Sequence, residues 1–268
     1  MQASLRQPPF EQMSILIATA LLNFSLAQFV TLPELFLPIQ FLGVFVPLRL
    51  TTNSLIAATS AGLIATGADW LIRRHPSAPK GSTLPNLVLP AFTAWILSFP
   101  LNNLDPGPTW WLALAGSGLA LLVVLSAEYA SLDSLDTRSS FANAVLASVA
   151  YAVFFILAVT LQSLNARLLF LVPTIGLAAA LVHLRITQIQ FGGWRWLESS
   201  AAGLLAISLA APLHYLHISP VAFGVLVLAA LYAFTVFNTN LLVGRSWRRA
   251  FLEPLLALAL GLVVAVIA

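Results

Sequence analysis

Two histidines lie three positions apart in the apolar stretch APLHYLHISP, residues 211–220. Histidine nitrogens bind metals and haem, and they exchange protons near neutral pH. On one helix His214 and His217 would share a face, but a third ligand would have to come from another segment. Their position between two apolar runs, with Tyr215 between them, is typical of amphipathic side chains at a membrane surface. We therefore predict interfacial histidines, with a metal site at His214 and His217 as the alternative.

Three other side chains form a candidate functional polar cluster: Glu128, Asp69 and His183. Asp69 has Arg73 four residues later, a spacing that allows an ion pair on one helix. Glu128 has no basic residue on its own helix, and a carboxylate at membrane depth is costly without a partner. We expect Glu128 to face the interior of the bundle. Pairing with His183 or Arg185 would make it structural, whereas proton transfer or ligand binding would make it functional.

Two further carboxylates, Glu198 and Glu253, begin predicted helices. A negative charge is favoured there by the helix dipole. Each also follows an arginine closely, since Arg195 lies three residues before Glu198 and Arg249 lies four before Glu253. We interpret both carboxylates as structural.

Several kinds of chemistry are excluded by the residues that the sequence lacks. With no cysteine, it has no disulfide, iron–sulfur cluster, thiolate zinc site or cysteine nucleophile. It contains no glycine-rich phosphate loop and no HExxH or GxSxG motif. No charged residue falls at the predicted centre of an apolar run, where ion-coupled transporters usually need one. We expect no cofactor, and we favour a role that is not enzymatic.

The composition places the chain in a membrane. Of its 268 residues, 60% are hydrophobic and only 8% are charged, whereas a soluble domain has about 25% charged residues. Such a chain cannot cover its surface with polar groups, so much of that surface must face lipid. The basic residues are scattered singly between apolar segments and do not form a nucleic-acid patch. We therefore expect the lipid bilayer as a partner and no nucleic acid.

Ten apolar runs are separated by charged residues, proline, glycine or asparagine. They span residues 13–32, 35–48, 54–72, 84–101, 109–129, 141–161, 168–184, 196–213, 219–238 and 250–268. Nine of them are long enough to cross the hydrocarbon core as helices, although the prolines within 84–101 predict a kinked or locally unwound path. The run 35–48 contains Pro38 and Pro47 and is short for a span. We expect it to be either a re-entrant or surface segment, or a tenth span.

The loop charges provide a separate test of these boundaries. From Arg73 onward, alternate loops place nine basic residues on one side and only Arg167 on the other. Cytoplasmic loops are enriched in arginine and lysine, so the basic side is predicted to be cytoplasmic and the C-terminus to lie outside. Arg6 favours a cytoplasmic N-terminus, which requires nine spans. Tryptophans at the predicted basic ends, such as Trp70 and Trp247, are typical of an aromatic belt.

Small and mildly polar residues indicate where helices could meet. Small residues recur every four positions at Ala58 with Gly62, Gly176 with Ala180, Ser199 with Gly203, and in two alanine stripes (57, 61, 65 and 202, 206, 210). Such stripes allow close helix packing in lipid. The mid-span polar residues suit hydrogen bonds between helices; they are Asn23, Ser60, Thr66, Ser117, Ser148, Thr174 and Ser208.

Taken together, these patterns predict an all-α, polytopic transmembrane bundle of nine or ten helices, forming a single integral-membrane domain over residues 1–268. The arginine-rich basic set suggests a bacterial cytoplasmic membrane. Three functions remain, in order of preference. The first is an accessory or scaffold subunit that associates with other membrane subunits or with itself through small-residue faces. The second is a permease for a small neutral or apolar solute. The third is a lipid-modifying enzyme that uses the polar cluster.

Overall fold

The computed structural model describes residues 9–30, 35–41, 44–78, 81–132 and 137–268, and the side chains of these residues except those of 35–50 and 137–138. Two residues used to predict the topology, Arg6 and Lys80, lie outside these ranges. The chain divides into two compact units, Met1–Leu146 and Ala147–Ala268, with the boundary inside one helix. The expectation of one domain over 1–268 stays a prediction.

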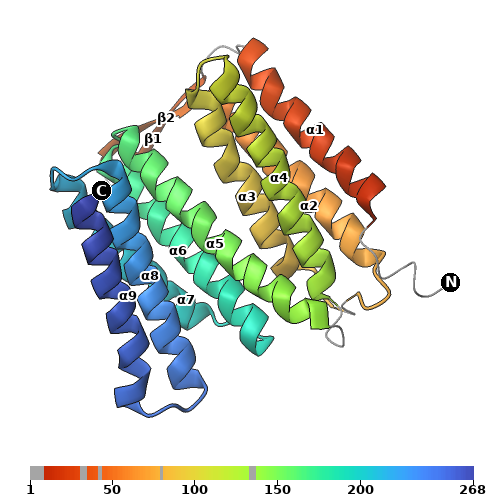
Figure 1. The fold of residues 1–268 in the computed structure, drawn as a ribbon. Helices are drawn as coiled ribbons and strands as arrows, with labels where there is room; N and C mark the ends of the chain where they lie inside the picture. Colours follow the sequence, from red (N-terminus) through yellow and green to blue (C-terminus); the bar gives the residue numbers. More distant parts are fainter. Residues whose placement is uncertain (1–8, 31–34, 42–43, 79–80, 133–136) are drawn as a thin grey trace. The chain divides into compact units, whose positions relative to one another are not determined.

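Nine α-helices occur in the described ranges, and all are long and apolar enough to cross a membrane. The predicted all-α transmembrane bundle is therefore confirmed, with nine helices. They are α1 (Phe10–Phe29), α2 (Thr52–Arg73), α3 (Leu84–Asn103), α4 (Pro108–Ser131), α5 (Thr137–Ser163), α6 (Leu168–Phe191), α7 (Trp196–Tyr215), α8 (Pro220–Leu242) and α9 (Trp247–Ile267) (Figure 1).

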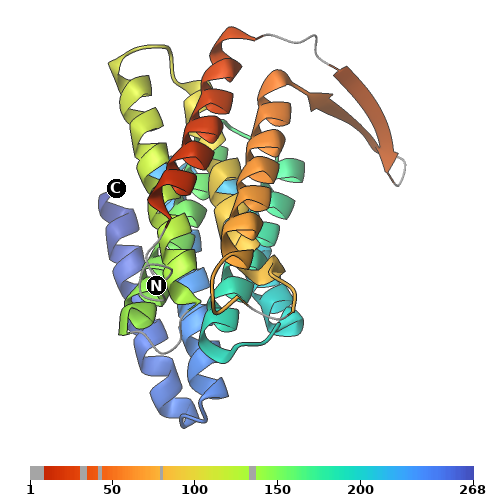
Figure 2. The ribbon, with the colours of Figure 1, turned by 90° about the vertical axis from the view of Figure 1, so that its right-hand side faces the viewer.

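The short run after α1 is not a tenth helix. It forms two antiparallel strands, β1 (Leu35–Phe41) and β2 (Val44–Leu50), which make a hairpin between α1 and α2 (Figure 2). The register places Pro38 opposite Pro47. Proline lacks a backbone N–H, so such a pair fits an antiparallel ladder only where the two residues exchange no hydrogen bond. The alternating valine and phenylalanine of β2 also favour a strand.

In the first unit, α1 packs against α2 and α4, and α3 packs against α2 and α4. Figures 1 and 2 show these four helices side by side. The face that α1 buries repeats every three or four residues and consists of Met13, Ile17, Ala20 and Phe24. It packs with buried leucine, isoleucine and alanine side chains of the other three helices. The core of this unit is therefore apolar.

One carbonyl near the end of α3 is bonded by two neighbouring helices. The last carbonyls of a helix have no partner within it. Here the Leu101 carbonyl accepts from Trp110 Nε1 of α4 and from Gln28 Nε2 of α1, each at 3.1 Å. Trp110 is accordingly buried, with 3% of its surface exposed. These two bonds tie three helices together at one end.

In the second unit, α6 packs against α7, α7 against α8, and α8 against α9. The small residues predicted on α6 and α7 lie in their contact: a Cβ built on Gly203 would lie 2.7 Å from the Gly176 carbonyl oxygen and 3.3 Å from the Ala180 Cβ. The stripe of alanines 202, 206 and 210 is almost fully buried. The prediction of close helix packing is confirmed for this pair.

Most of the mid-span polar residues behave differently from the prediction. Asn23 and Ser60 of that set join two helices, with Asn23 Nδ2 of α1 donating to Ser60 Oγ of α2 at 2.7 Å. The hydroxyls of Thr66, Ser117, Thr174 and Ser208 donate to carbonyls four residues earlier on their own helices. A hydroxyl in a helix has that carbonyl within reach, so it needs no second helix.

Two helices also differ from the expected path. Helix α6 continues to Phe191, so Arg185 lies within it and not in a loop, and only 4% of Arg185 is exposed. Its Nη1 donates to Gln188 Oε1 one turn later. The path expected for 84–101 was kinked or locally unwound. Helix α3 stays helical through Pro90 and Pro100, which excludes the unwinding, and the kink stays a prediction.

Candidate functional site

Asp69 lies in the last turn of α2 and joins it to the start of α3. Its Oδ2 accepts from Arg73 Nε at 2.7 Å, which confirms the predicted ion pair. Its Oδ1 accepts from the hydroxyl of Thr83, the residue before α3. Both residues that bind Asp69 also line, with it, a shallow pocket of about 330 Å³. Both carboxylate oxygens of Asp69 accept hydrogen bonds, and through them the residue connects the end of α2 to the start of α3.

His75, which the sequence analysis did not select, lies just after α2. Its ring packs edge-on against Tyr129 of α4, with centroids 4.5 Å apart. Its Nδ1 accepts from the backbone N–H of Ser77 at 3.0 Å, and only 5% of the residue is exposed. His75 and Tyr129 are 54 residues apart, so the sequence could not predict their contact. It showed His75 only as a histidine next to the basic pair Arg73 and Arg74.

Glu128 lies near the C-terminal end of α4, which is predicted to face the cytoplasm. It is buried, with 1% of its surface exposed. This agrees with the expectation that it faces protein. It belongs to the first unit, together with Asp69, whereas His183 and Arg185 belong to the second. Its pairing with His183 or Arg185, and the grouping of Asp69, Glu128 and His183, stay predictions.

His183 is the centre of a polar cluster in the second unit, which we call the His183 cluster: the buried His183 and Ser199 and the half-buried Asn238. The side chain of His183 on α6 is fully buried. Asn238 Nδ2 of α8 donates to His183 Nε2 at 3.1 Å, so the proton of the neutral ring lies on Nδ1 and is donated to Ser199 Oγ of α7 at 3.0 Å. The ring of Phe234 packs beside it at 5.5 Å. The cluster thus connects three helices through both ring nitrogens.

Glu198 and Glu253, the two carboxylates expected to begin helices, both contact arginines. Glu198 lies in the first turn of α7. Helix α9 begins at Trp247, so Glu253 lies in its second turn, and the expectation that Glu253 begins a helix is wrong. Glu198 Oε1 accepts from Arg195 Nη1 at 3.0 Å, as the spacing predicts. Glu253 contacts Arg245 Nη1 at 3.4 Å and also accepts from Asn240 Nδ2. The partner found for Glu253 is therefore Arg245, in the loop between α8 and α9, and not the expected Arg249. The chain turns at Gly244, whose φ is +79°, and this turn brings Arg245 back toward the end of α8.

The two histidines of the APLHYLHISP stretch lie at the end of α7 and just beyond it. His214 Nδ1 lies 3.2 Å from Gln162 Oε1 of α5 and donates to it, whereas His217 is exposed. Tyr215 is 71% exposed. Within the described ranges, no group of three or more histidine, cysteine, aspartate or glutamate side chains is arranged to hold a metal ion.

The chemistry open to these sites is limited by their hydrogen bonds. A general base needs a free lone pair directed at its substrate. His183 uses both ring nitrogens in contacts with neighbouring helices, so it has no free lone pair. Asp69 accepts one hydrogen bond on each carboxylate oxygen, and each oxygen keeps a second lone pair. In this arrangement both side chains hold helices in place.

Comparison with curated proteins and with solved structures gives no match to this chain. The family model described as "Protein of unknown function (DUF5656)" matches residues 32–268, which contain the hairpin and all helices from α2 to α9, and the chain belongs to this family.

Proposed function

We propose that this multi-pass membrane protein is an accessory or scaffold subunit that works by associating with another membrane protein or with a second copy of itself. The observation that carries the proposal is a row of small residues on α2, Ser54, Ala58, Gly62 and Thr66, which recur every four positions and are all exposed. No described atom lies within 4 Å of a Cβ built on Gly62. Such a face admits another helix at short distance.

The contacts of the titratable side chains support the same role. Asp69, Glu198 and Glu253 bind arginines near helix ends, and His183 joins three helices. A protein that uses these groups to fix its own helices has few of them left for catalysis. Association needs only a shaped apolar surface, which α2 offers.

Gly62→Leu tests the proposal directly. The larger side chain should prevent close approach of a second helix, while the free energy of unfolding stays near the wild-type value because the position is open. We expect blue native electrophoresis of mildly solubilised membranes to show a smaller complex for this variant. The matched control is Ala259→Leu, at an exposed position on α9. Wild type, Gly62→Leu and Ala259→Leu running at the same size would refute association through α2.

The orientation belongs to the proposal as well: basic loops in the cytoplasm of a bacterium and the C-terminus outside. The absence of cysteine makes the chain its own blank for labelling. Single cysteines at Ser77, Gln190 and Ser246 should react only with a membrane-permeant maleimide. Those at Asn103 and Ser219 should react with an impermeant reagent added to intact cells. Reversed labelling at two or more positions would overturn the orientation.

A permease for a small neutral solute is the second candidate, supported by the division of the chain into two compact units. Many transporters consist of two helical halves that move against each other. Proteoliposomes should then shrink and reswell faster with glycerol or urea than protein-free vesicles do. Equal rates would remove these solutes from consideration.

A lipid-modifying enzyme that uses Glu128, Asp69 and His183 is the third candidate. Glu128→Gln keeps the shape of the side chain and removes its charge. Loss of a lipid product in cells, with normal amounts of assembled protein, would favour this candidate. An unchanged lipid profile would leave Glu128 with a structural role only.

A further inference from the structure

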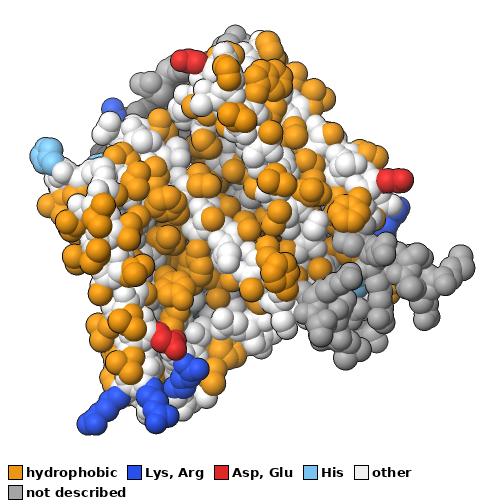
Figure 3. Space-filling model, in the orientation of Figure 1, with side chains coloured by type: hydrophobic (Ala, Val, Ile, Leu, Met, Phe, Trp, Pro, Cys, Tyr) orange, Lys and Arg blue, Asp and Glu red, His pale blue; other side chains and the backbone are white. Residues whose placement is uncertain are grey.

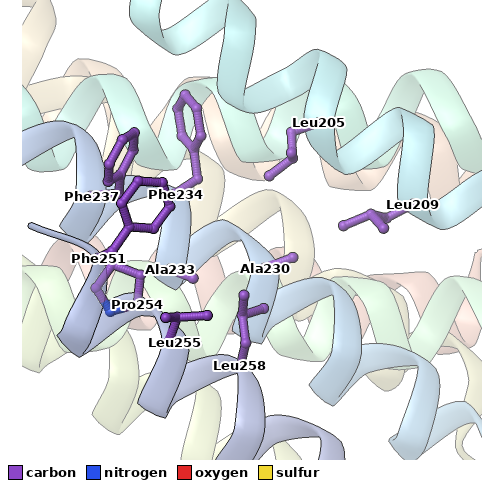
Figure 4. Close-up of a pocket in the computed structure, with 10 residues that line it drawn as sticks. All are labelled: Leu205, Leu209, Ala230, Ala233, Phe234, Phe237, Phe251, Pro254, Leu255 and Leu258. Carbon is purple, nitrogen blue, oxygen red and sulfur yellow. The ribbon is translucent and has the colours of Figure 1, made fainter. Parts of the chain in front are cut away.

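An apolar groove of about 370 Å³ lies on the second unit between α7, α8 and α9 (Figure 4). Ala230 and Ala233 of α8 form its floor, because their short side chains leave room beneath the neighbouring helices. Leucines line it from α7 and α9, at positions 205, 209, 255 and 258, and all of its lining side chains are hydrocarbon. The groove offers no hydrogen bond to a polar solute.

One end of the groove is aromatic. Phe237 and Phe251 line it with ring centroids 4.5 Å apart, and Trp247 packs against both, 5.3 Å from each. Trp247 is itself 62% exposed and is the first residue of α9. Tryptophan prefers the level of the lipid headgroups. The groove therefore runs from the membrane interface, at the loop between α8 and α9, toward the hydrocarbon core.

The same end of the groove carries positive charge. Arg245 donates a hydrogen bond to Asn240 and forms an ion pair with Glu253, which lies at the same end of the groove. Arg248 and Arg249 are exposed, and the described contacts include no ion pair for either. Figure 3 shows basic side chains gathered at the end of α8 and α9 that holds their connecting loop, below a hydrophobic surface. This end has a surplus of positive charge at the level of the headgroups.

Helical spacing distinguishes the two arginines. The residues of α9 that line the groove, Phe251, Pro254, Leu255 and Leu258, follow the i, i+3, i+4, i+7 pattern of one helix face. One turn earlier, the same face is occupied by Trp247 and Arg248, in the first turn of the helix. Successive residues of a helix are rotated by about 100°, so Arg249 points away from the face that lines the groove. Arg248 is thus the arginine in line with the groove.

We propose that the groove binds one anionic phospholipid, with an acyl chain along Ala230 and Ala233 and the phosphate at Arg248. The walls suit a narrow, flexible chain better than a second helix, because bulky leucines and not small residues line both sides. The charge selects an anionic headgroup, since a basic residue near the interface attracts one. The site is distinct from the small-residue face of α2 and does not depend on it.

Native mass spectrometry of the detergent-solubilised full chain tests the proposal. Phosphatidylglycerol and phosphatidylcholine with identical acyl chains would be added separately, and the fraction of protein carrying one lipid measured. We expect wild type to bind phosphatidylglycerol roughly fivefold more tightly, the contribution of about one basic residue at an interface. Arg248→Gln should abolish this preference, whereas the matched control Arg249→Gln should keep it.

Filling the groove tests the acyl chain separately. Ala230→Leu should weaken binding of both lipids and leave their ratio unchanged. If that variant is poorly folded, Leu209→Trp fills the groove from its wall, where the leucine is 36% exposed. Retained lipid binding in folded groove-filled variants would show that the lipid binds elsewhere and would overturn the proposal. Equal losses in Arg248→Gln and Arg249→Gln would overturn the assignment of the phosphate to Arg248.

Discussion

Two stretches of small residues look alike in the sequence and are used in opposite ways. On α2, Ala58 and Gly62 are exposed, and no described atom lies within 4 Å of a Cβ built on Gly62. On α6 and α7, Gly176 and Gly203 face each other so closely that a Cβ on Gly203 would lie 2.7 Å from a backbone oxygen. A four-residue repeat of small side chains shows that another helix can pack closely against that face. It does not show whether the approaching helix belongs to the same fold.

The polar residues of the two units differ in a similar way. Asp69 of the first unit binds Arg73, four residues away, near a helix end where 65% of the arginine side chain is exposed, and also accepts from Thr83, 14 residues away. His183 of the second unit is fully buried and binds side chains 16 and 55 residues away in the sequence. Where water is present, a polar group can rely on its neighbours in sequence. Where water is excluded, it needs partners from other helices.

The largest expected loss of stability comes from placing a large side chain in the contact between α6 and α7. Gly203→Leu should lower the free energy of unfolding by about 3 kcal/mol, because the added atoms meet the Gly176 backbone, which cannot rotate away. SDS-induced unfolding in mixed micelles measures this loss. Gly62→Leu is the matched control and should unfold like wild type. Similar losses in both variants would show that the two stripes do not differ in packing.

The His183 cluster should give the next largest effect. His183→Leu leaves the buried Ser199 hydroxyl and the half-buried Asn238 amide without this partner, and we expect a loss of about 2 kcal/mol in the same assay. The double variant His183→Leu, Asn238→Leu should lose less than the sum of the single changes, because both ends of one hydrogen bond are removed together. Strict additivity would contradict a bond between these two side chains.

The smallest effect is expected at the end of α2. Asp69→Asn keeps an acceptor for Thr83 and removes only the charge that faces an exposed arginine, an interaction that water and salt screen. The unfolding midpoint should therefore stay close to the wild-type value. Added salt should reduce even this small difference. A loss of stability as large as that of His183→Leu would show that Asp69 contributes more than a screened surface ion pair does.

Much of the local structure followed from the sequence by itself. Composition and the length of the apolar runs predicted a membrane protein of nine or ten helices, because burying a backbone in lipid requires helical hydrogen bonding. Contacts over three or four residues were also predictable, such as Arg195 with Glu198 and Asp69 with Arg73. Proline marked the run 35–48 as unusual, although its strand pairing emerged only in the structure.

Contacts between distant residues were decided by the tertiary structure alone. Trp110 with Leu101, His75 with Tyr129, the His183 cluster and the groove over Ala230 all depend on how each helix is rotated about its axis. In a soluble protein that rotation is visible as an apolar stripe on one face. Here the lipid-facing side is as apolar as the protein-facing side, so the sequence carries little periodic signal, and only packing and the pairing of buried polar groups fix which face turns inward.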